Sequence, residues 1–225
     1  MIPVVLASQS PARRQILTAA GIDPHIIVSD VDERAIESDF AGSVGDLTIA
    51  LSRAKARAVV DRLTVSPPEG LSSADTIVVI AGDSLLEFDG QPIGKPGDAE
   101  GTRAVWARIA GQWTQLHSGH TVAVLRRRHA DEASAAGLEL SDLRSRRSTT
   151  SVLIGTPTPD ELEAYVATEE PFHVAGALTI DGYGGAFVDR LDGDHLTVLG
   201  LSLPVVRETV TDMGLFWPDL WSSRR

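Results

Sequence analysis

The 225-residue sequence contains no cysteine, only two lysines, and few aromatic residues, which make up 5% of the chain. Without cysteine the protein has no disulfide and no thiolate metal site, so carboxylates and histidines are the side chains left to bind a metal. No apolar run is long enough to span a membrane, and no basic region followed by an apolar segment opens the sequence. We therefore expect a cytoplasmic protein without a membrane partner.

Positive charge is also scarce, and the formal net charge at pH 7 is −11. This balance disfavours a protein that wraps nucleic acid, so we expect no nucleic-acid partner. An acidic protein can still bind a polyphosphate when its few cations converge or when a divalent metal mediates the contact. Because nearly all the basic residues are arginines, the isolated Lys55 and Lys95 are candidates for such contacts.

The N-terminal segment combines an apolar strand, a serine-containing loop and the start of a helix. Residues 2–6 form the expected strand, and Ser10 suits the N-cap of a helix that opens with a proline. Backbone N–H groups and the helix dipole at such a junction favour an anion. Ser8 lies in the same loop, and Arg13 and Arg14 lie one turn into the helix, within reach of a bound phosphate. The alternative is a plain strand–helix connection with arginines in solvent.

Strands and helices alternate along the rest of the chain. The pattern predicts helices over residues 11–20, 43 or 46 to 63, 98–110 and 158–168, and a final helix opened by Pro204. It predicts strands over residues 25–28, 76–81, 85–88, 91–93, 113–125, 149–154, 177–180, 186–191 and 195–198. The polar residues 126–148 are expected to form a mobile excursion. The fold class is α/β, a mixed twisted sheet with flanking helices in one domain over residues 1–225, with lobes over residues 1–111 and 112–215.

Polar residues follow several of the expected strands. Ser8 follows the first strand, Asp83 follows the apolar run 76–81, and Lys95 follows the hairpin. Ligands of open α/β sheets bind at the carboxyl ends of the strands, so parallel strands would bring these side chains into one cleft. Lys55 and an acidic turn that contains Glu33 would complete a set suited to a metal-bound polyphosphate. Taken separately, each residue also fits a simpler role as a turn former or a solvated charge.

Six segments, in order along the chain, resemble motifs of the Maf family of nucleoside triphosphate pyrophosphatases, which is linked by name to septum-formation inhibition. They are LASQSPARRQIL (6–17) beside S-x-S-P-R-R-x-x-L, LSRAKA (51–56) beside L-A-x-x-K-A, AGDS (81–84) beside G-A-D-T, GKP (94–96), LHSG (116–119) beside V-x-T-G, and the stretch from YVATEEPF onward (165–203) beside E-P-x-D-K-A-G-A-Y-G-I-Q-G. One such match would carry little information, whereas the ordered set is specific.

The resemblance implies a fold of the Maf and ITPase type, with two lobes around a central nucleotide cleft. It implies hydrolysis of a nucleoside triphosphate between the α- and β-phosphates, which would remove non-standard or excess nucleotides, and it requires a divalent cation, Mg²⁺ or Mn²⁺. Asp83 would activate water, and Glu33 would support catalysis and share the metal with Asp83. The residues that would hold the phosphates are Ser8, Ser10, Arg13, Arg14, Lys55 and Lys95. A homodimer is the candidate assembly.

This chain departs from the family at the positions associated with base recognition. The thymidine and uridine triphosphate branch has Arg, Thr and Gln where this sequence has Ala12, Ser84 and Asp181. Alanine donates no hydrogen bond, and a carboxylate only accepts hydrogen bonds, whereas glutamine donates and accepts. We therefore expect a broader or shifted base preference, and an exocyclic amine on the base would suit Asp181.

Two other functions remain open from the sequence. A nucleotidyltransferase also uses Mg²⁺, lysine and carboxylates at strand ends, but it usually has a longer glycine-rich phosphate loop. A non-catalytic nucleotide-binding regulator of cell division would keep the pocket without turnover. The joint presence of Asp83, Lys55 and Lys95 favours the hydrolase.

Overall fold

The computed structural model describes residues 1–128 and 137–222. Within these residues a seven-stranded sheet has the order β2–β1–β3–β5–β6–β7, and β4 pairs with the far end of β3. Its strands are β1 (Val4–Leu6), β2 (His25–Ile26), β3 (Thr76–Phe88), β4 (Gln91–Ile93), β5 (Trp113–Arg128), β6 (Gly137–Ile154) and β7 (Val188–Asp192). β1 runs parallel to β2 and β3 and the other pairs are antiparallel, so the sheet is mixed, as expected.

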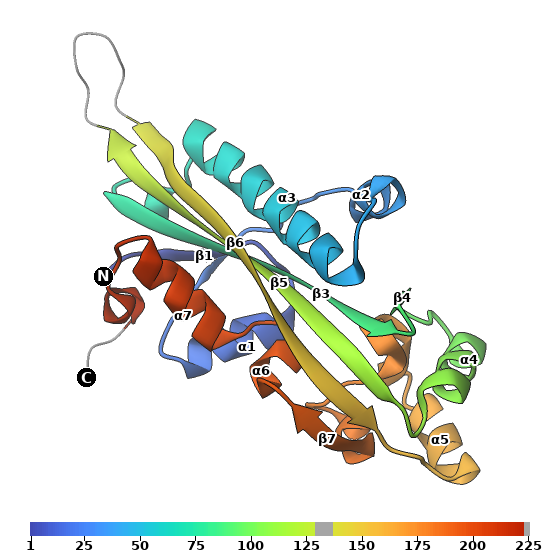
Figure 1. Ribbon diagram of the computed structural model, residues 1–225. Coiled ribbons are helices and arrows are strands. Elements are labelled where there is room, and N and C mark those ends of the chain that lie inside the picture. The colour runs from blue at the N-terminus through green and yellow to red at the C-terminus, as the bar shows by residue number, and fades with distance from the viewer. Residues whose placement is uncertain (129–136, 223–225) are drawn as a thin grey trace.

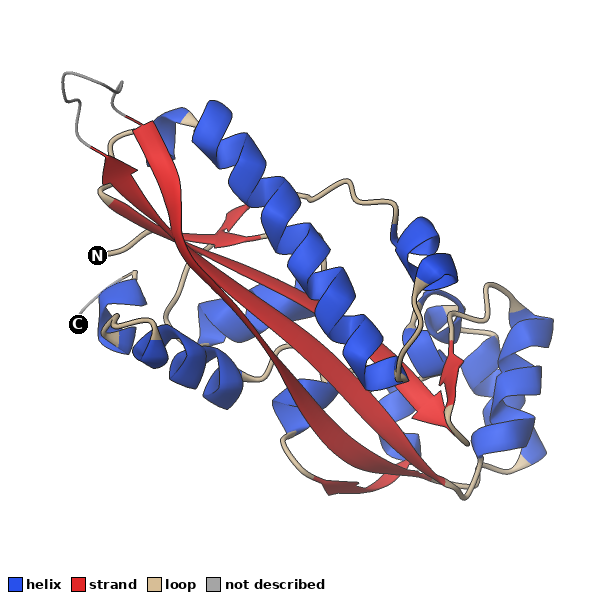
Figure 2. Cartoon of the chain, turned by 45° about the horizontal axis from the view of Figure 1, so that its top comes forward, coloured by secondary structure: helices blue, strands red, loops and turns tan. Residues whose placement is uncertain are grey.

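Helices cover both faces of the sheet (Figures 1 and 2). The α-helices are α1 (Pro11–Ala19), α2 (Glu33–Asp39), α3 (Val44–Val65), α4 (Ala99–Ile109), α5 (Pro159–Val166), α6 (His195–Val198) and α7 (Leu203–Asp212). The 3₁₀ helices are η1 (Glu69–Leu71), η2 (Glu170–His173), η3 (Ala175–Ala177), η4 (Tyr183–Phe187) and η5 (Trp217–Leu220). α3 lies along one face of the long strands, and α1 and α7 lie on the opposite face (Figure 1).

The alternation of side chains along β3 separates two cores, one on each face of the sheet. Ile77 and Val79 pack with Val59 of α3, whereas Val78 and Ile80 pack on the opposite face with residues of α1 and α7. A third core surrounds Trp106 at the far end of the sheet, where α4 and α5 lie. The face that a β3 side chain occupies therefore decides which helix it meets.

α3 packs closely on the sheet because a glycine lies beneath it. A Cβ atom on Gly119 of β5 would lie 2.2 Å from the carbonyl oxygen of Thr48, so only glycine fits there. One turn further along α3, the hydroxyls of Ser52 and Thr121 are 2.9 Å apart and hydrogen-bonded. This close contact fixes the height of α3 above the strands and, with it, the position of Lys55.

The expected helix starts are confirmed by their capping bonds. Ser10 Oγ accepts the backbone N–H of Arg13 at the start of α1, and Ser43 is the N-cap of α3. α4 begins after Asp98, and Thr158 opens α5 with a capping box. Each of these signals lies within four residues of sequence, so local chemistry was enough to predict them.

The predicted end of the third strand near residue 81 is wrong. β3 continues to Phe88, and β5 pairs with it from Thr76 opposite Arg126 to Glu87 opposite Gln115. This continuous ladder keeps the backbone extended through Gly82. Asp83 therefore lies inside a strand rather than in the loop after it.

Most of the expected excursion over residues 126–148 is also wrong. Residues 126–128 belong to β5 and residues 137–148 to β6, whose ladder extends to Arg128 opposite Gly137. Backbone pairing holds these residues in strands, although Leu138, Leu140 and Leu143 are the only apolar side chains among residues 138–148. The remaining residues of the expected excursion, 129–136, lie outside the described part of the chain.

Three shorter predictions need correction. The acidic turn ends where α2 begins, because Asp32 accepts the backbone N–H of Ala35 and thereby caps a helix. Residues 195–198 form α6 rather than a strand, since Asp194 caps them through the N–H of Leu196. Residues 177–180 lie in no strand: Ala177 ends η3, and the three residues after it form part of the wall of the site described below.

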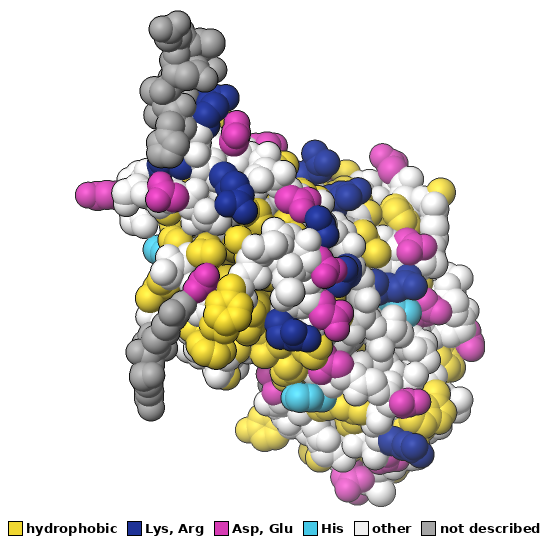
Figure 3. All heavy atoms as spheres, turned by 60° about the vertical axis from the view of Figure 1, so that its left-hand side comes forward, with side chains coloured by type: hydrophobic (Ala, Val, Ile, Leu, Met, Phe, Trp, Pro, Cys, Tyr) yellow, Lys and Arg dark blue, Asp and Glu magenta, His cyan; other side chains and the backbone are white. Residues whose placement is uncertain are grey.

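None of the helices in residues 1–128 and 137–222 is long and apolar enough to cross a membrane. Acidic and basic side chains are interspersed on the face drawn in Figure 3, between patches of apolar side chains.

Candidate active site

The middle of β3 has an open edge next to β1. β1 pairs with β3 only as far as Leu6 opposite Ile80, and β4 begins to pair at Leu86. Between these points no strand of the described chain occupies this side of β3. Residues 81–85 therefore border open space in the middle of a sheet, where side chains of both faces are within reach of one ligand.

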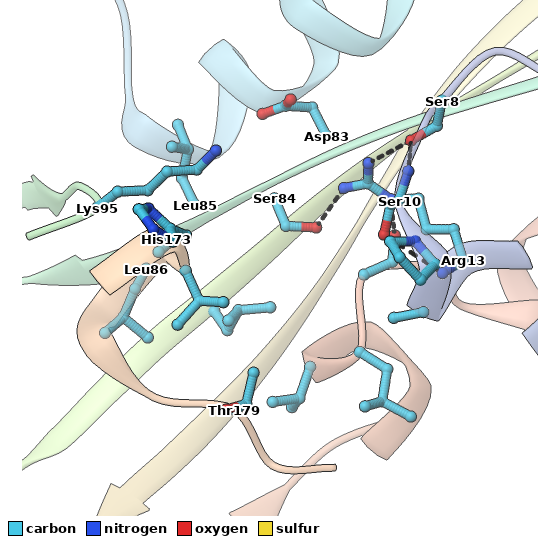
Figure 4. Close-up of a pocket in the computed structure, with 18 of the residues that line it drawn as sticks. Ser8, Ser10, Arg13, Asp83, Ser84, Leu85, Leu86, Lys95, His173 and Thr179 are labelled. Carbon is cyan, nitrogen blue, oxygen red and sulfur yellow. Dashed lines mark hydrogen bonds between the residues drawn. The ribbon is translucent and has the colours of Figure 1, made fainter. Parts of the chain in front are cut away.

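A cleft of about 840 Å³ lies at this open edge. Its walls come from the β1–α1 loop, α2, α3, β3, the segment after β4, the residues that follow η2, and the α6–α7 connection. A volume of this size is within the range of small-molecule sites. The close-up in Figure 4 shows Arg13 and Ser8 on one side of the cleft and Lys95 on the other.

On the α3 face of the sheet, one lysine joins two carboxylates. Lys55 Nζ donates a hydrogen bond of 2.6 Å to Asp83 Oδ1 and lies 3.0 Å from Glu33 Oε1. The side chains of Lys55 and Asp83 are only 10% and 9% exposed, whereas Glu33 is 47% exposed at the mouth of the cleft. The three predicted residues thus form one cluster. Its Lys55–Asp83 part is buried, and its Glu33 part is exposed to solvent.

Burial raises the pKa of Asp83, and the positive charges of Lys55 and Arg13 oppose that increase. Burial also raises the pKa of Glu37, one turn after Glu33 on α2, and the negative charges of Asp83 and Glu33 raise it further. A carboxylate whose pKa is raised is a better proton acceptor than an ordinary surface carboxylate. The electrostatics of the cluster therefore suit Asp83 as a general base.

On the opposite face, Arg13 lies in a slot between two glycines. Its guanidinium donates to the carbonyl oxygen of Gly200 at 2.8 Å, to Ser8 Oγ at 3.1 Å and to Ser84 Oγ at 3.2 Å (Figure 4). A Cβ atom on Gly82 or Gly200 would lie 3.1 or 3.3 Å from Arg13 Nε, so the two glycines make room for it. A guanidinium carries five N–H donors, and these three bonds leave two for a ligand in the cleft.

Lys95 and His173 lie on the other side of the cleft (Figure 4). Two backbone hydrogen bonds join their segments, from Gly97 N–H to the carbonyl of Phe172 at 2.9 Å and from Gly176 N–H to that of Gly94 at 3.3 Å. Lys95 is exposed, and its amino group has no hydrogen bond or ion pair with any residue that the structure describes. It is therefore free to contact an anion.

The floor of the cleft on the Arg13 face is apolar. It consists of Leu86, Leu116, Val152, Ile154, Leu178 and Val198. Thr179 and Asp181 lie at its border, and Glu170 fixes the segment that carries them. The Glu170 carboxylate accepts hydrogen bonds from the Thr179 hydroxyl and from the backbone N–H groups of Tyr183 and Gly184. The cleft thus has a charged end and an end suited to a flat apolar group.

All but one of the residues predicted from the sequence line this cleft. They are Ser8, Ser10, Ala12, Arg13, Glu33, Lys55, Asp83, Ser84, Lys95 and Asp181. Arg14 does not: it is exposed and borders a separate surface pocket together with Gln15 and Asp23. The side of α1 that carries Ala12 and Arg13 faces the cleft, and Arg14, about 100° further around the helix, lies outside it.

The sequence alone did not identify several other lining residues. Arg34 and Glu37 belong to α2, and their spacing from Glu33 would have indicated a shared helix had the acidic turn been interpreted as a cap. Thr179 was assigned to a strand, and nothing in its sequence context marks it as part of a binding site. Glu170 acts only through the residues that it positions.

The donor set fits a divalent cation that a substrate helps to bind. Asp83 and Glu33 offer carboxylate oxygens on either side of Lys55, but no three Asp, Glu, His or Cys side chains of the described residues are grouped to hold a metal. Mg²⁺ is often bound by one or two carboxylates and completed by water and phosphate oxygens. Two carboxylates beside a phosphate site match that pattern.

Comparison with known proteins places this chain in one family. The family model described as "Maf-like protein" matches residues 3–213. A curated relative from Nocardia farcinica is 44% identical over 97% of this chain and 96% of its own length, and one from Streptomyces coelicolor is 42% identical over 97% and 94%. Both are named nucleoside triphosphate pyrophosphatase. Among solved structures, the Staphylococcus aureus Ham1 protein matches with a TM-score of 0.43 at 13% identity, over 94% of this chain and 99% of that chain.

Proposed function

Because the chain belongs to the Maf-like family, we propose that it hydrolyses nucleoside triphosphates between the α- and β-phosphates, releasing a nucleoside monophosphate and pyrophosphate. The observation that carries this proposal is the buried Lys55–Asp83 pair, which lies at a cleft bordered by Arg13 and by the exposed Lys95. Water activation and phosphate binding need such groups side by side.

Arg13 and Lys95 contact the triphosphate from opposite walls of the cleft. Arg13, held by three hydrogen bonds, offers its two remaining donors from a fixed position. Lys95 approaches from the opposite wall on a flexible side chain. Charged groups held in place before the reaction stabilise the charge that develops on phosphate oxygens without having to reorganise. Ser10 caps α1 and so places the positive end of the helix dipole on the Arg13 side.

Asp83 takes a proton from the attacking water as the anhydride bond breaks. Its carboxylate lies within the cleft wall, and Lys55 fixes one of its oxygens. Lys55 also opposes the effect of burial on the pKa of Asp83, because the ammonium stabilises the carboxylate. In this assignment Lys55 positions the base and balances the charge of the site.

Asp83 and Glu33 would hold the divalent cation, Mg²⁺ or Mn²⁺. Such a cation, when bound, neutralises phosphate oxygens and lowers the pKa of a coordinated water. The exposed end of Glu33 faces the mouth of the cleft, on the side from which a metal–nucleotide complex would enter.

Product analysis tests this function. The purified chain is incubated with a panel of ribo- and deoxyribonucleoside triphosphates and Mg²⁺ or Mn²⁺, with an EDTA-treated sample and Asp83→Asn as controls. We expect monophosphate and pyrophosphate in equal amounts, only when metal is present. Diphosphate with inorganic phosphate would contradict cleavage between the α- and β-phosphates. Transfer of the nucleotide to an acceptor would indicate a nucleotidyltransferase, and tight binding without products would indicate a regulator.

The proposal also covers the location of the protein in the cell, its partners and its assembly. We expect a cytoplasmic protein with no nucleic-acid or membrane partner, which suits an enzyme whose substrates are free nucleotides. A homodimer is the expected assembly, and light scattering coupled to size-exclusion chromatography measures it directly. A monomer at all concentrations would contradict it.

A further inference from the structure

The direction of the hydrogen bonds around Ser84 follows from the chemistry of its neighbours. Ser118 Oγ donates to the carbonyl oxygen of Thr197 at 2.8 Å, because a carbonyl can only accept. A serine hydroxyl has one proton, so Ser118 can only accept in its 2.7 Å bond with Ser84. Ser84 therefore donates its proton to Ser118, and it accepts from Arg13. Towards the cleft, Ser84 can offer only a lone pair.

The hydroxyl proton of Thr179, at the opposite border of the apolar floor, is likewise already donated to another residue. Its hydroxyl donates to the carboxylate of Glu170. The pKa of Glu170 is lowered by the hydrogen bonds it receives from Thr179, Tyr183 and Gly184, although burial acts in the opposite sense. Glu170 is therefore ionised at neutral pH and cannot donate in return. Thr179, like Ser84, can only accept a hydrogen bond from a ligand.

Asp181 completes the set, since a carboxylate has no proton to donate. The three side chains line the same cleft as Leu86, Leu178 and the rest of the apolar floor. Ser84 and Leu86 point to the same face of β3, which follows from the alternation of a strand. Of the cationic side chains of the cleft, Arg13 donates to Ser84 from its slot between Gly82 and Gly200, and Lys95 lies on the opposite wall.

We infer that the apolar end of the cleft selects nucleobases that carry an exocyclic amino group, because Ser84, Thr179 and Asp181 can each only accept a hydrogen bond from a ligand. This inference rests on the proposed function and specifies its substrate class. Cytosine and adenine each present an amino group to such a wall. Uracil and thymine present a carbonyl oxygen at the corresponding position. A carboxylate, or a hydroxyl that already donates its proton to another residue, cannot donate a hydrogen bond to that oxygen.

Comparing cytidine and uridine triphosphates tests the selection for an amino group. The two bases differ only along the edge that carries the amino group in cytosine and the carbonyl oxygen in uracil. A hydrogen bond to a charged acceptor contributes about 1.5–3 kcal/mol, so kcat/KM for cytidine triphosphate should exceed that for uridine triphosphate by about tenfold or more. Equal values, or a preference for uridine triphosphate, would overturn the inference.

Ser118 offers a sharper test, because it is fully buried and lies outside the cleft lining. Ser118→Ala removes the acceptor of the Ser84 proton, so the Ser84 hydroxyl becomes free to donate to a carbonyl in the cleft. The ratio of cytidine to uridine triphosphate use should then fall at least about threefold, whereas Ser118→Thr, which keeps the hydroxyl, should preserve it. A merely structural role for Ser118 would lower both activities together, and an unchanged ratio in Ser118→Ala would exclude the directional hydrogen bond.

Asp181→Asn provides an independent test on the surface of the cleft. Asparagine adds two N–H donors at nearly the same volume, so use of uridine triphosphate should rise relative to cytidine triphosphate. This variant keeps the inference falsifiable if Ser118→Ala fails to fold. An unchanged ratio in Asp181→Asn would show that Asp181 does not contact the base.

Binding separates failure of this inference from failure of the proposed function. Asp83→Asn is titrated calorimetrically with cytidine and uridine triphosphates, so the nucleotides stay intact. Absence of turnover in the unmodified chain, together with tighter binding of cytidine triphosphate, would reject the pyrophosphatase and retain the base selection. Turnover of all triphosphates with equal binding would reject the base selection and retain the pyrophosphatase.

Discussion

Asp83 and Ser84 are neighbours on β3, yet their side chains meet different helices on opposite faces of the sheet. Asp83 accepts a hydrogen bond from Lys55 of α3, and Ser84 accepts one from Arg13 of α1. Because β3 has an open edge at this point, one ligand can contact both residues. On β3, the residue proposed for the reaction, Asp83, and the residue proposed for base recognition, Ser84, are thus consecutive and lie on opposite faces of the sheet.

Replacing Asp83 by Asn keeps the shape of the side chain and removes its capacity to accept a proton. We expect kcat to fall by about 10²–10⁴-fold while nucleotide binding persists. Steady-state kinetics and calorimetry measure the two effects separately. Near-normal turnover would transfer the role of the base to another group, and Glu33 would be the next candidate.

Lys55→Met should lower both stability and activity, because Asp83 would remain buried without its partner. Breaking one side of a buried ion pair typically costs about 3–5 kcal/mol of unfolding free energy. In a double-mutant cycle, Asp83→Asn added to Lys55→Met should recover part of this loss. Urea denaturation of the four proteins provides the values, and strictly additive effects would contradict a coupled pair.

Lys95→Ala should affect substrate binding and leave stability unchanged, because the Lys95 side chain is exposed and unpaired within the described chain. Loss of a charge-assisted contact with a phosphate should reduce kcat/KM by about tenfold or more. Lys95→Arg is the matched control, since it retains the charge. A large drop in melting temperature with normal kinetics would instead make Lys95 a structural residue.

His120 gives the fold a dependence on pH. Burial, followed by the positive charge of Arg13, lowers the pKa of His120 from 6.5 to about 4, and its Nε2 accepts the backbone N–H of Ser202 at 2.8 Å. The unfolded chain therefore binds the proton first, so stability falls as pH decreases from 6.5 towards 4. The loss should reach about 3 kcal/mol.

His120→Gln should remove that component while keeping an acceptor for Ser202. Urea denaturation of both proteins at several pH values between 7 and 4 measures the difference. Parallel pH dependences of the two unfolding free energies would show that His120 does not contribute.

The triple change Ala12→Arg, Ser84→Thr, Asp181→Gln tests the departure from the thymidine and uridine triphosphate branch. It restores donors at two positions of the cleft, where Asp181 now only accepts. We expect the variant to shift towards thymidine and uridine triphosphates, because unpaired polar groups reject the wrong base strongly. A preference of about a thousandfold for those two nucleotides in the unmodified chain would contradict our interpretation of these positions.

The sequence by itself determined the parts of the structure that depend on neighbouring residues. Ser10 and Thr158 cap helices through bonds that span three residues, and the apolar run 76–81 needed no more than its composition to be recognised as a strand. The motifs around Ser8, Lys55, Asp83 and Lys95 were also visible, and all four residues line one cleft. Local chemistry is enough for such features because their partners are close in sequence.

Tertiary structure alone decided where the long strands end and which way the side chains of the site face. Backbone pairing with β5 extends β3 through Asp83, and pairing between β5 and β6 holds residues 137–148 in a strand despite their polar sequence. The proton of Ser84 is directed by Ser118 and Thr197, which lie 34 and 113 positions further along the chain. A hydrogen bond has a direction only once both of its partners are placed, and folding is what places them.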